Sequence, residues 1–206
     1  MTEIDKSHRA PVAAVPLPDP DDWESIRRWR VACRSLLIKT RIGIGKVRRR
    51  KYLQNIQCSI MDLLIDIDPG IIGFYWPIKG EFDLRGLVAD LIERGWQAAL
   101  PVVVKREAPL EFYRWTPETK LLPGFWNIPV PQEPVIVKPS VLLIPLVGYD
   151  RENYRLGHGG GYYDRTLASF HKRPLSIGIG LGNCTLDTIY PQQHDIAMDR
   201  IVTVDT

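Results

Sequence analysis

The chain has few of the features that mark several common protein classes. Its 206 residues include only three cysteines, Cys33, Cys58 and Cys184, and no CxxC pair. This argues against a disulfide framework or a zinc site and favours free thiols in a reducing cytosol. No apolar run approaches the roughly 18 residues of a membrane span, and the first twenty residues lack the apolar core of a signal peptide. We therefore expect a cytoplasmic protein that makes no contact with a membrane.

Several catalytic and binding motifs are missing as well. There is no GxSxG turn for a serine nucleophile and no GxxxxGK[ST] P-loop, and the four histidines show no metal-ligand spacing. The net charge of +3 suits anionic small molecules but falls short of a nucleic-acid-binding composition. The basic run KVRRRK at residues 46–51 has no interleaved aromatic residues, so a solvated helix face explains it better than a nucleic-acid patch.

The composition indicates one ordinary globular domain. Apolar residues make up 45% of the chain and charged residues 25%, which is enough to bury a real core. Residues 1–20 carry four prolines and predict a disordered tail, which leaves residues 21–206 as a single domain that we expect to be a monomer.

The hydrophobic pattern predicts alternating helices and strands. Apolar residues at helical spacing predict a first helix that begins at a cap, Asp21 or Asp22, and runs to about Thr40. They predict a second helix that reaches Leu64 and a third between Asp83 and Gly95. Buried strands are predicted at residues 71–76, 98–104, 110–115, 141–147, 175–181 and 200–204. The strand–helix–strand unit over residues 71–104 indicates an α/β fold with a mostly parallel, Rossmann-like sheet.

A glycine-rich stretch, RLGHGGGYYDR at residues 155–165, is the strongest functional signal. It holds glycines at positions 157, 159, 160 and 161, follows a predicted strand and opens a helical pattern. Its N–H groups and the positive end of the helix dipole would point at one place, an arrangement that binds phosphate. A plain flexible turn is the alternative.

Three further features could complete a phosphate site. Glu81 ends a short loop after the strand at residues 71–76, so it should lie at the same sheet edge as the glycines. Arg30 and Arg34 are spaced by four and point the same way from the first helix, although a solvated basic face would look alike. Asp164 stands just past the glycines, where a hard cation such as Mg²⁺ could bridge to phosphate.

Two residues stay ambiguous on sequence alone. His158 lies inside the glycine stretch, where it could touch phosphate or simply tolerate the turn. Trp126 lies in the extended stretch LLPGFWNIPVP at residues 121–131, where three prolines exclude a helix. It could cover the edge of the sheet or offer a flat surface to a ring.

The glycine stretch resembles a known family. Arg155-Leu156-Gly157-x-Gly159-x-Gly161-Tyr162-Tyr163-Asp164, preceded by an apolar strand with Pro145, is similar to the motif of the 5-formyltetrahydrofolate cyclo-ligase family, also called methenyltetrahydrofolate synthetase. The resemblance covers roughly residues 22–204 and takes in the arginine pair, the Glu81-x-Asp83 segment, WNIPVP and HDIAMD.

The resemblance implies a fold, a reaction and roles for residues. It implies a single three-layer α/β/α domain that uses ATP and Mg²⁺ to turn 5-formyltetrahydrofolate, a reduced folate, into 5,10-methenyltetrahydrofolate, with no nucleic acid or membrane partner. The implied ATP-binding residues are Arg30, Arg34, Arg155, Gly157, His158, Gly159, Gly160, Gly161 and Tyr162. The implied metal ligands are Asp164 and Asp195; Glu81 and Tyr163 would be catalytic, and Trp76, Glu81, Trp126 and Tyr163 would bind the substrate.

The sequence departs from the family pattern at three places. Arg30 stands where the family usually has lysine, Val130 where many members have an acid, and Asn183-Cys184-Thr185 where many have a glutamine. The changes leave the ATP side intact and concern folate recognition. Two alternatives therefore remain: an ATP-dependent enzyme of the same fold acting on another vitamin-derived compound, and a nucleotide-binding protein without turnover.

Overall fold

The computed structural model describes residues 11–204. Its helices are α1 (Trp23–Ile42), α2 (Lys46–Leu64), α3 (Arg85–Glu93) and α4 (Tyr162–Ser169), and short 3-10 helices lie at Pro11–Ala14, Phe125–Asn127 and Gly182–Cys184. The strands are β1 (Ile71–Gly73), β2 (Gln97–Val102), β3 (Glu111–Trp115), β4 (Leu121–Pro123), β5 (Pro129–Pro131), β6 (Ile136–Val137), β7 (Val141–Pro145), β8 (Gly148–Asp150), β9 (Arg155–Leu156), β10 (Leu175–Leu181), β11 (Thr185–Leu186) and β12 (Arg200–Val204).

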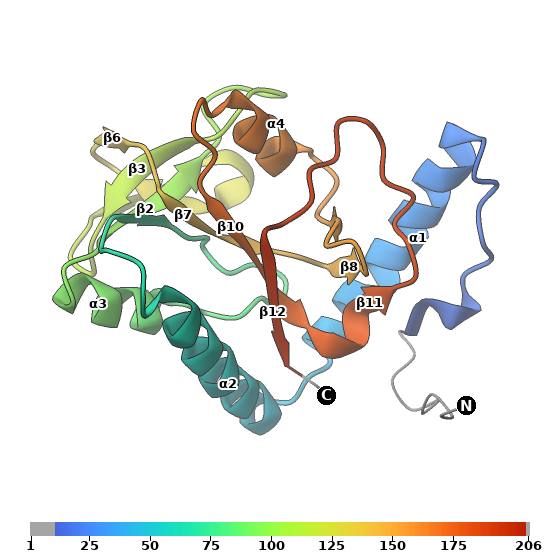
Figure 1. Cartoon of the computed structure of the whole chain (residues 1–206), viewed down its shortest axis with the longest axis horizontal. Coiled ribbons are helices and arrows are strands. Elements are labelled where there is room, and N and C mark those ends of the chain that lie inside the picture. The colour runs from blue at the N-terminus through green and yellow to red at the C-terminus, as the bar shows by residue number, and fades with distance from the viewer. Residues whose placement is uncertain (1–10, 205–206) are drawn as a thin grey trace.

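A seven-stranded sheet forms the centre of the molecule (Figure 1). Its strand order is β12-β10-β7-β1-β2-β3-β6; neighbours from β12 to β2 run parallel, whereas β3 pairs antiparallel with β2 and with β6. The predicted α/β fold with a mostly parallel sheet is therefore confirmed.

Apolar side chains pack against both faces of this sheet. Along β7, Val141 and Leu143 join a large core that includes residues of α1, α2 and α3. Leu142 and Ile144 point the other way, into a smaller core with Leu167 of α4. A strand buried on both faces reads as a continuous apolar run, which is why this strand was visible in the sequence.

Helix α1 begins where the sequence predicted. Asp22 is its N-cap, and its carboxylate accepts hydrogen bonds from the N–H groups of Glu24 and Ser25 at 3.0 and 3.1 Å. Ile26, Trp29, Cys33 and Leu37 are buried along one stripe. The stripe fixes the rotation of α1 and thereby the direction in which its arginines point.

Some predicted boundaries differ from the structure. Strand β1 ends at Gly73 rather than at residue 76, and the N-cap of α3 is Leu84, although Asp83 still accepts the Arg85 N–H at 3.1 Å. The proline-rich stretch at 121–131, expected as a loop, forms the antiparallel β4–β5 hairpin, in which Pro123 pairs with Pro129. Prolines are tolerated there because this two-stranded sheet leaves their nitrogens on a free edge.

The predicted disordered tail falls partly outside the described residues, since residues 1–10 are not among them. Within its remainder, Pro11–Ala14 form a 3-10 helix, and Val12 and Val15 pack against the large core. In residues 11–204, no helix combines the length and the hydrophobicity that a bilayer crossing requires.

Candidate active site

The strand order places a topological switch point between β1 and β7. From β1 the chain continues to β2 on one side, and from β7 it continues to β10 on the other. Loops that leave neighbouring parallel strands in opposite directions open a crevice at the carboxyl ends of the strands, where ligands of such sheets bind. The loop after β1 ends at Glu81, and the segment after β7 leads through the β8–β9 hairpin to the glycines.

The glycine loop, residues 157–161, presents free main-chain donors. Gly159 and Gly161 have φ of +94° and +63°, in the left-handed region that glycine adopts without strain. Among the described residues, none of the five N–H groups of this loop finds a protein acceptor. The loop leads directly into α4, so these donors and the helix N-terminus form a site suited to an anion such as phosphate.

Arg34 lies against this loop. Its Nε donates to the Gly157 carbonyl oxygen at 2.8 Å, and a Cβ built on Gly159 would lie 3.3 Å from its Cζ. Burial and the nearby Arg30 lower the pKa of Arg34, while Asp195 opposes them. A guanidinium that is largely removed from water beside open N–H groups is a strong partner for phosphate oxygens.

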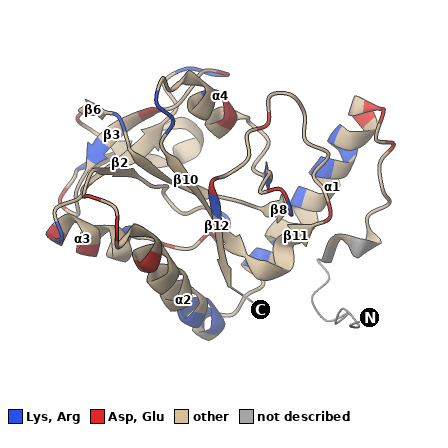
Figure 2. Ribbon diagram, in the orientation of Figure 1, with Lys and Arg blue, Asp and Glu red and all other residues tan. Residues whose placement is uncertain are grey.

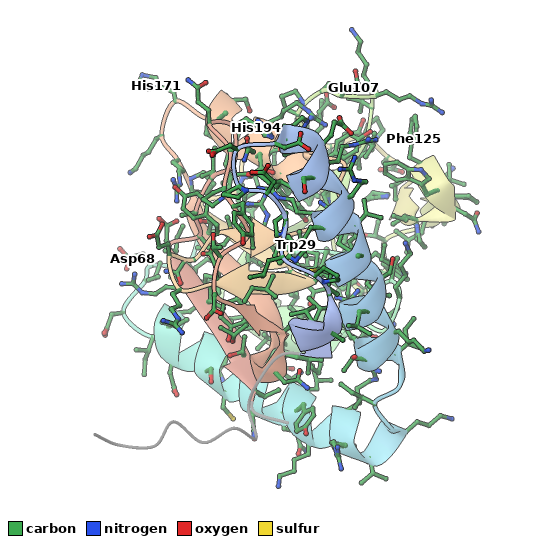
Figure 3. All side chains as sticks on the ribbon, turned by 90° about the vertical axis from the view of Figure 1, so that its right-hand side faces the viewer. Trp29, Asp68, Glu107, Phe125, His171 and His194 are labelled. Carbon is green, nitrogen blue, oxygen red and sulfur yellow. The ribbon has the colours of Figure 1, made fainter. Side chains whose placement is uncertain are left out.

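Arg30, the other member of the predicted pair, is engaged differently. It is buried, and it donates to the Ile189 and Tyr190 carbonyl oxygens at 2.9 and 2.8 Å and to the Asp195 carboxylate at 2.7 Å. The loop that carries His194 and Asp195 therefore lies along α1 (Figures 1 and 3). Arg30 acts here as a clamp on that loop, and its contact with ATP stays a prediction.

Arg155 and Asp164 form a buried pair at the start of α4. Their Nη2 and Oδ2 atoms are 2.9 Å apart, and Arg155 also donates to the Ile196 carbonyl oxygen at 3.1 Å. The other carboxylate oxygen of Asp164 accepts the Ile196 N–H at 3.1 Å. Arg155 is thus buried and held between Asp164 and the Ile196 backbone, and its contact with ATP stays a prediction.

The same contacts bear on a magnesium site. Asp164 is bonded to Ile196, the residue after Asp195, so the two predicted metal ligands are brought close together. Each is balanced by an arginine, and residues 11–204 hold no cluster of three or more potential metal-ligating side chains. Mg²⁺ bound with a nucleotide needs only one or two carboxylates beside phosphate oxygens and water. The donor set therefore fits Mg²⁺ bound together with a phosphate ligand.

Glu81 is the buried carboxylate of the site. Its Oε2 accepts the Ile78 N–H at 2.9 Å, and its Oε1 lies 2.8 Å from His158 Nε2 and 3.5 Å from Arg41 Nη2. The His158 contact joins the loop after β1 to the glycine loop across the switch point. His158 meets Glu81 in this structure, and its predicted contact with ATP stays a prediction.

Two tyrosines line the surroundings of Glu81. Burial raises the pKa of Tyr163 well above its usual value, Glu81 adds to the rise and Arg155 opposes it. Burial likewise raises the pKa of Tyr75, again with Glu81 adding and Arg41 opposing. Both phenols thus stay protonated at neutral pH and can donate a hydrogen bond near the carboxylate.

The two tryptophans predicted to bind the substrate, Trp76 and Trp126, each contact a neighbouring side chain. Trp76 stacks under the Arg85 guanidinium, with Cζ 4.4 Å from the ring centroid. Trp126 is 67% exposed and meets Tyr162 edge to face at 5.7 Å, so it borders the glycine loop rather than covering the sheet edge. Its neighbour Phe125 lies at the tip of the β4–β5 hairpin, which projects from the body of the molecule (Figure 3).

Sequence reasoning missed Arg41, Arg49 and Tyr75. A signal for Arg41 was present: it follows Cys33 and Leu37 at intervals of four, which places an arginine on the buried stripe of α1. Arg49 was assigned to a solvated face with the rest of KVRRRK, but it donates to the carbonyl oxygens of Gly80 and Arg41. No local pattern could reveal these acceptors, because the fold alone brings them to it.

The arrangement is suited to phosphoryl transfer. The glycine loop can hold an anionic phosphate, Arg34 can neutralise it, and Glu81 can hold or accept a proton from a second reactant at the switch point. Such chemistry depends mainly on positioning and on charge stabilisation, for which a partly buried polar site is well suited.

Residues 27–204 match the model of the 5-formyltetrahydrofolate cyclo-ligase family. The chain belongs to this family. A cyclo-ligase of Mycolicibacterium smegmatis is 32% identical over 137 residues, which cover 63% of this chain and 71% of that protein. The solved 5,10-methenyltetrahydrofolate synthetase of Aquifex aeolicus is 28% identical, with a TM-score of 0.73 over 84% of this chain and 89% of that one. The synthetase of Mycoplasma pneumoniae is 25% identical, with a TM-score of 0.69 over 84% and 96%. This membership confirms the resemblance that the motifs indicated.

Proposed function

We propose that this cyclo-ligase family member uses Mg-ATP to convert 5-formyltetrahydrofolate into 5,10-methenyltetrahydrofolate, releasing ADP and phosphate. The observation that carries the proposal is the 2.8 Å contact between His158 and Glu81. It brings a buried carboxylate and an anion-binding loop to one switch point, where two substrates can react. The family match and the names of the relatives support the choice of substrate.

In the proposed reaction the formyl oxygen attacks the γ-phosphorus of ATP and ADP leaves. Folate N10 then adds to the formyl carbon, which closes the ring, and loses its proton. The phosphate departs with the former formyl oxygen and leaves the methenyl group. Glu81 Oε1 is the group that we assign to accept the N10 proton, because this buried carboxylate faces the glycine loop. Tyr163 is a neutral phenol whose pKa is raised by burial and by Glu81, and we assign it to donate a hydrogen bond to the formyl group.

The nucleotide side is assigned to the glycine loop and to Arg34. Free N–H groups of residues 157–161 would hold the triphosphate, with Tyr162 at the start of α4 and Arg34 on the opposite side. Asp164 and Asp195 would hold Mg²⁺, which when bound neutralises phosphate charge. Arg155 and Arg30 orient these two carboxylates. Trp76 and Trp126 remain our choices for contacts with the folate rings.

The direct test is to incubate the purified protein with Mg-ATP and 5-formyltetrahydrofolate and follow the methenyl product by its ultraviolet absorbance. We expect product to form only when both substrates are present. ATP binding without product would overturn the proposal in favour of another vitamin-derived substrate or of a nucleotide-binding protein without turnover.

Glu81→Gln provides the matched variant for this assay. It keeps the shape of the side chain but removes the charge, so we expect unchanged ATP affinity and a loss of turnover of about 100-fold or more, as is typical when a general base is removed. Unchanged turnover would show that another group takes the N10 proton.

A further inference from the structure

Arg41 lies beneath the switch point and touches both sides of it. It is in the last turn of α1 and is 4% exposed. Its Nε donates to the Lys79 carbonyl oxygen at 3.1 Å, in the loop after β1. Its Nη1 donates to the Leu146 carbonyl oxygen at 3.2 Å, just beyond β7. Two of its three nitrogens thus fix the guanidinium between the two segments that form the crevice.

The third nitrogen has no hydrogen-bond partner among the described residues. Arg41 Nη2 is buried and makes no hydrogen bond there, and it forms an ion pair with Glu81 Oε1 at 3.5 Å. Burial lowers the pKa of Arg41, and Glu81 opposes this more than any other group. A buried donor that makes no hydrogen bond is costly and rare in folded proteins. Its persistence here calls for a role in the site.

We propose that Arg41 is a positioning residue that holds the Glu81 carboxylate in place and aimed at the substrate. The proposal rests on the function proposed above. Of the two side chains on Glu81 Oε1, His158 belongs to the glycine loop and can move when that loop takes up a nucleotide. Arg41 is anchored to two main-chain carbonyls and cannot leave with it. Arg41 is therefore the contact that Glu81 retains when His158 is displaced.

A second arginine, Arg49, binds both the turn that carries Glu81 and the backbone of Arg41. Arg49 of α2 donates to the Gly80 carbonyl oxygen and, at 2.6 Å, to that of Arg41. Gly80 has φ of +79°, and a Cβ there would lie 3.4 Å from both the Arg41 carbonyl oxygen and Arg49 Nη2. The turn that carries Glu81 therefore rests on two arginines. Figure 2 shows the basic residues of α1 and of the start of α2 from which they come.

Arg41 could instead serve only as a structural tie between the Lys79 and Leu146 carbonyls. Both roles predict a loss of stability when Arg41 is replaced, so stability alone does not distinguish them. They differ in whether Arg41 is coupled to Glu81. If Arg41 positions Glu81, replacing Arg41 should have a smaller effect once Glu81 is already replaced by glutamine. If Arg41 only ties the two carbonyls together, the effect of replacing it should not depend on residue 81.

A double-mutant cycle separates the two roles. Arg41→Gln, Glu81→Gln and the double variant are prepared as full-length chains, with Lys39→Gln as a control for charge loss in the same helical turn. Thermal unfolding is measured for all, together with kcat and KM for ATP and 5-formyltetrahydrofolate. Arg41→Lys is included as the conservative change, because it keeps the charge without the planar fork; it takes the place of Arg41→Gln throughout should that chain not fold.

We expect Arg41→Gln to lower kcat by about 100-fold, the loss typical of a reacting group misplaced by about 1 Å, with KM for ATP unchanged within about twofold. We also expect the Tm changes of the two single variants not to add in the double variant. Additive Tm changes, or an unchanged kcat in folded protein, would overturn the assignment. If the wild-type chain forms no methenyl product but the cycle still shows coupling, the proposed function fails while the positioning of Glu81 stands.

Discussion

Among the arginines of α1, Arg34 is the one whose free surface faces the glycine loop. Arg30 and Arg41 donate to main-chain carbonyls and pair with Asp195 and Glu81, whereas within the described residues the one hydrogen bond of Arg34 leads to the Gly157 carbonyl. Its remaining donors therefore lie beside five N–H groups that have no acceptor within residues 11–204. This makes Arg34 the residue whose removal should affect nucleotide binding most directly.

We expect Arg34→Ala to weaken ATP binding by about 1.5–3 kcal/mol, the range for a hydrogen bond to a charged group, or about 10- to 150-fold in Kd. Isothermal titration with ATP in the presence of Mg²⁺ measures the change. Arg27→Ala is the matched control, because Arg27 lies on the same helix but is exposed and pairs with Glu24. An equal Kd for the two variants would show that Arg34 does not bind ATP and belongs only to a solvated basic face, the alternative that the sequence left open.

At the scale of residues, the sequence indicated which side chains to consider for the site but not which groups they contact. Chain order singled out the glycines and Glu81 as candidates at one sheet edge, and a spacing of four singled out the arginine pair. The partners were not found: Arg30 meets the Tyr190 carbonyl 160 residues away, and His158 meets Glu81 across 77 positions. Contacts of this kind follow from packing of the whole chain and leave no periodic trace.

At the scale of elements, the backbone conformation of the glycine loop decides which of its positions require glycine. Gly159 has φ of +94° and lies against Arg34, so a side chain there is strained and would displace the guanidinium. A Cβ built on Gly157 would meet no neighbouring atom within 4 Å, and the φ of this residue is not positive. Two glycines two residues apart thus face different constraints.

We expect Gly159→Ala to cost about 1–2 kcal/mol in the free energy of unfolding, or about 2–8 °C in Tm, because an L-residue is strained in the left-handed region. Gly157→Ala should leave Tm unchanged or slightly higher, since it only restricts the unfolded chain. Differential scanning calorimetry of both variants makes the comparison. Equal losses would mean that the two positions do not differ in backbone conformation as described.

The boundaries of some strands could be predicted and those of others could not. The strands at 175–181 and 200–204 were predicted to the residue, whereas the strand predicted at 141–147 ends at Pro145. The β4–β5 hairpin was missed, since prolines mask a strand that lies on a free edge. Strand β1 was predicted too long because Phe74 and Tyr75 are buried after the ladder has ended.

At the scale of the whole molecule, the three cysteines differ in whether the core shields them from solvent. Burial raises the pKa of Cys33 to about 11, against the effect of Arg34, and that of Cys184 to about 12, against the effect of Arg41. Cys58 on α2 is exposed. The three thiols are unpaired, as the sequence indicated.

We expect one thiol per chain to react with a disulfide reagent such as DTNB at pH 8, and three after denaturation. At that pH a thiol with a pKa of about 11 is roughly one part in a thousand thiolate, and the thiolate is the reactive form. Cys58→Ser should abolish the fast reaction. Fast labelling of two or more thiols in the native chain would show that α1 or the 3-10 helix at Gly182–Cys184 opens readily.

The clamp made by Arg30 has a consequence for how this chain can evolve. A planar guanidinium donates through Nε to one carbonyl and through Nη2 to a second carbonyl and a carboxylate. A lysine at this position would offer one nitrogen and could not reproduce that fork. Arg30 therefore constrains the backbone at 189–190 and Asp195 together. A change of Arg30 to lysine would be tolerated only if other donors replaced these contacts.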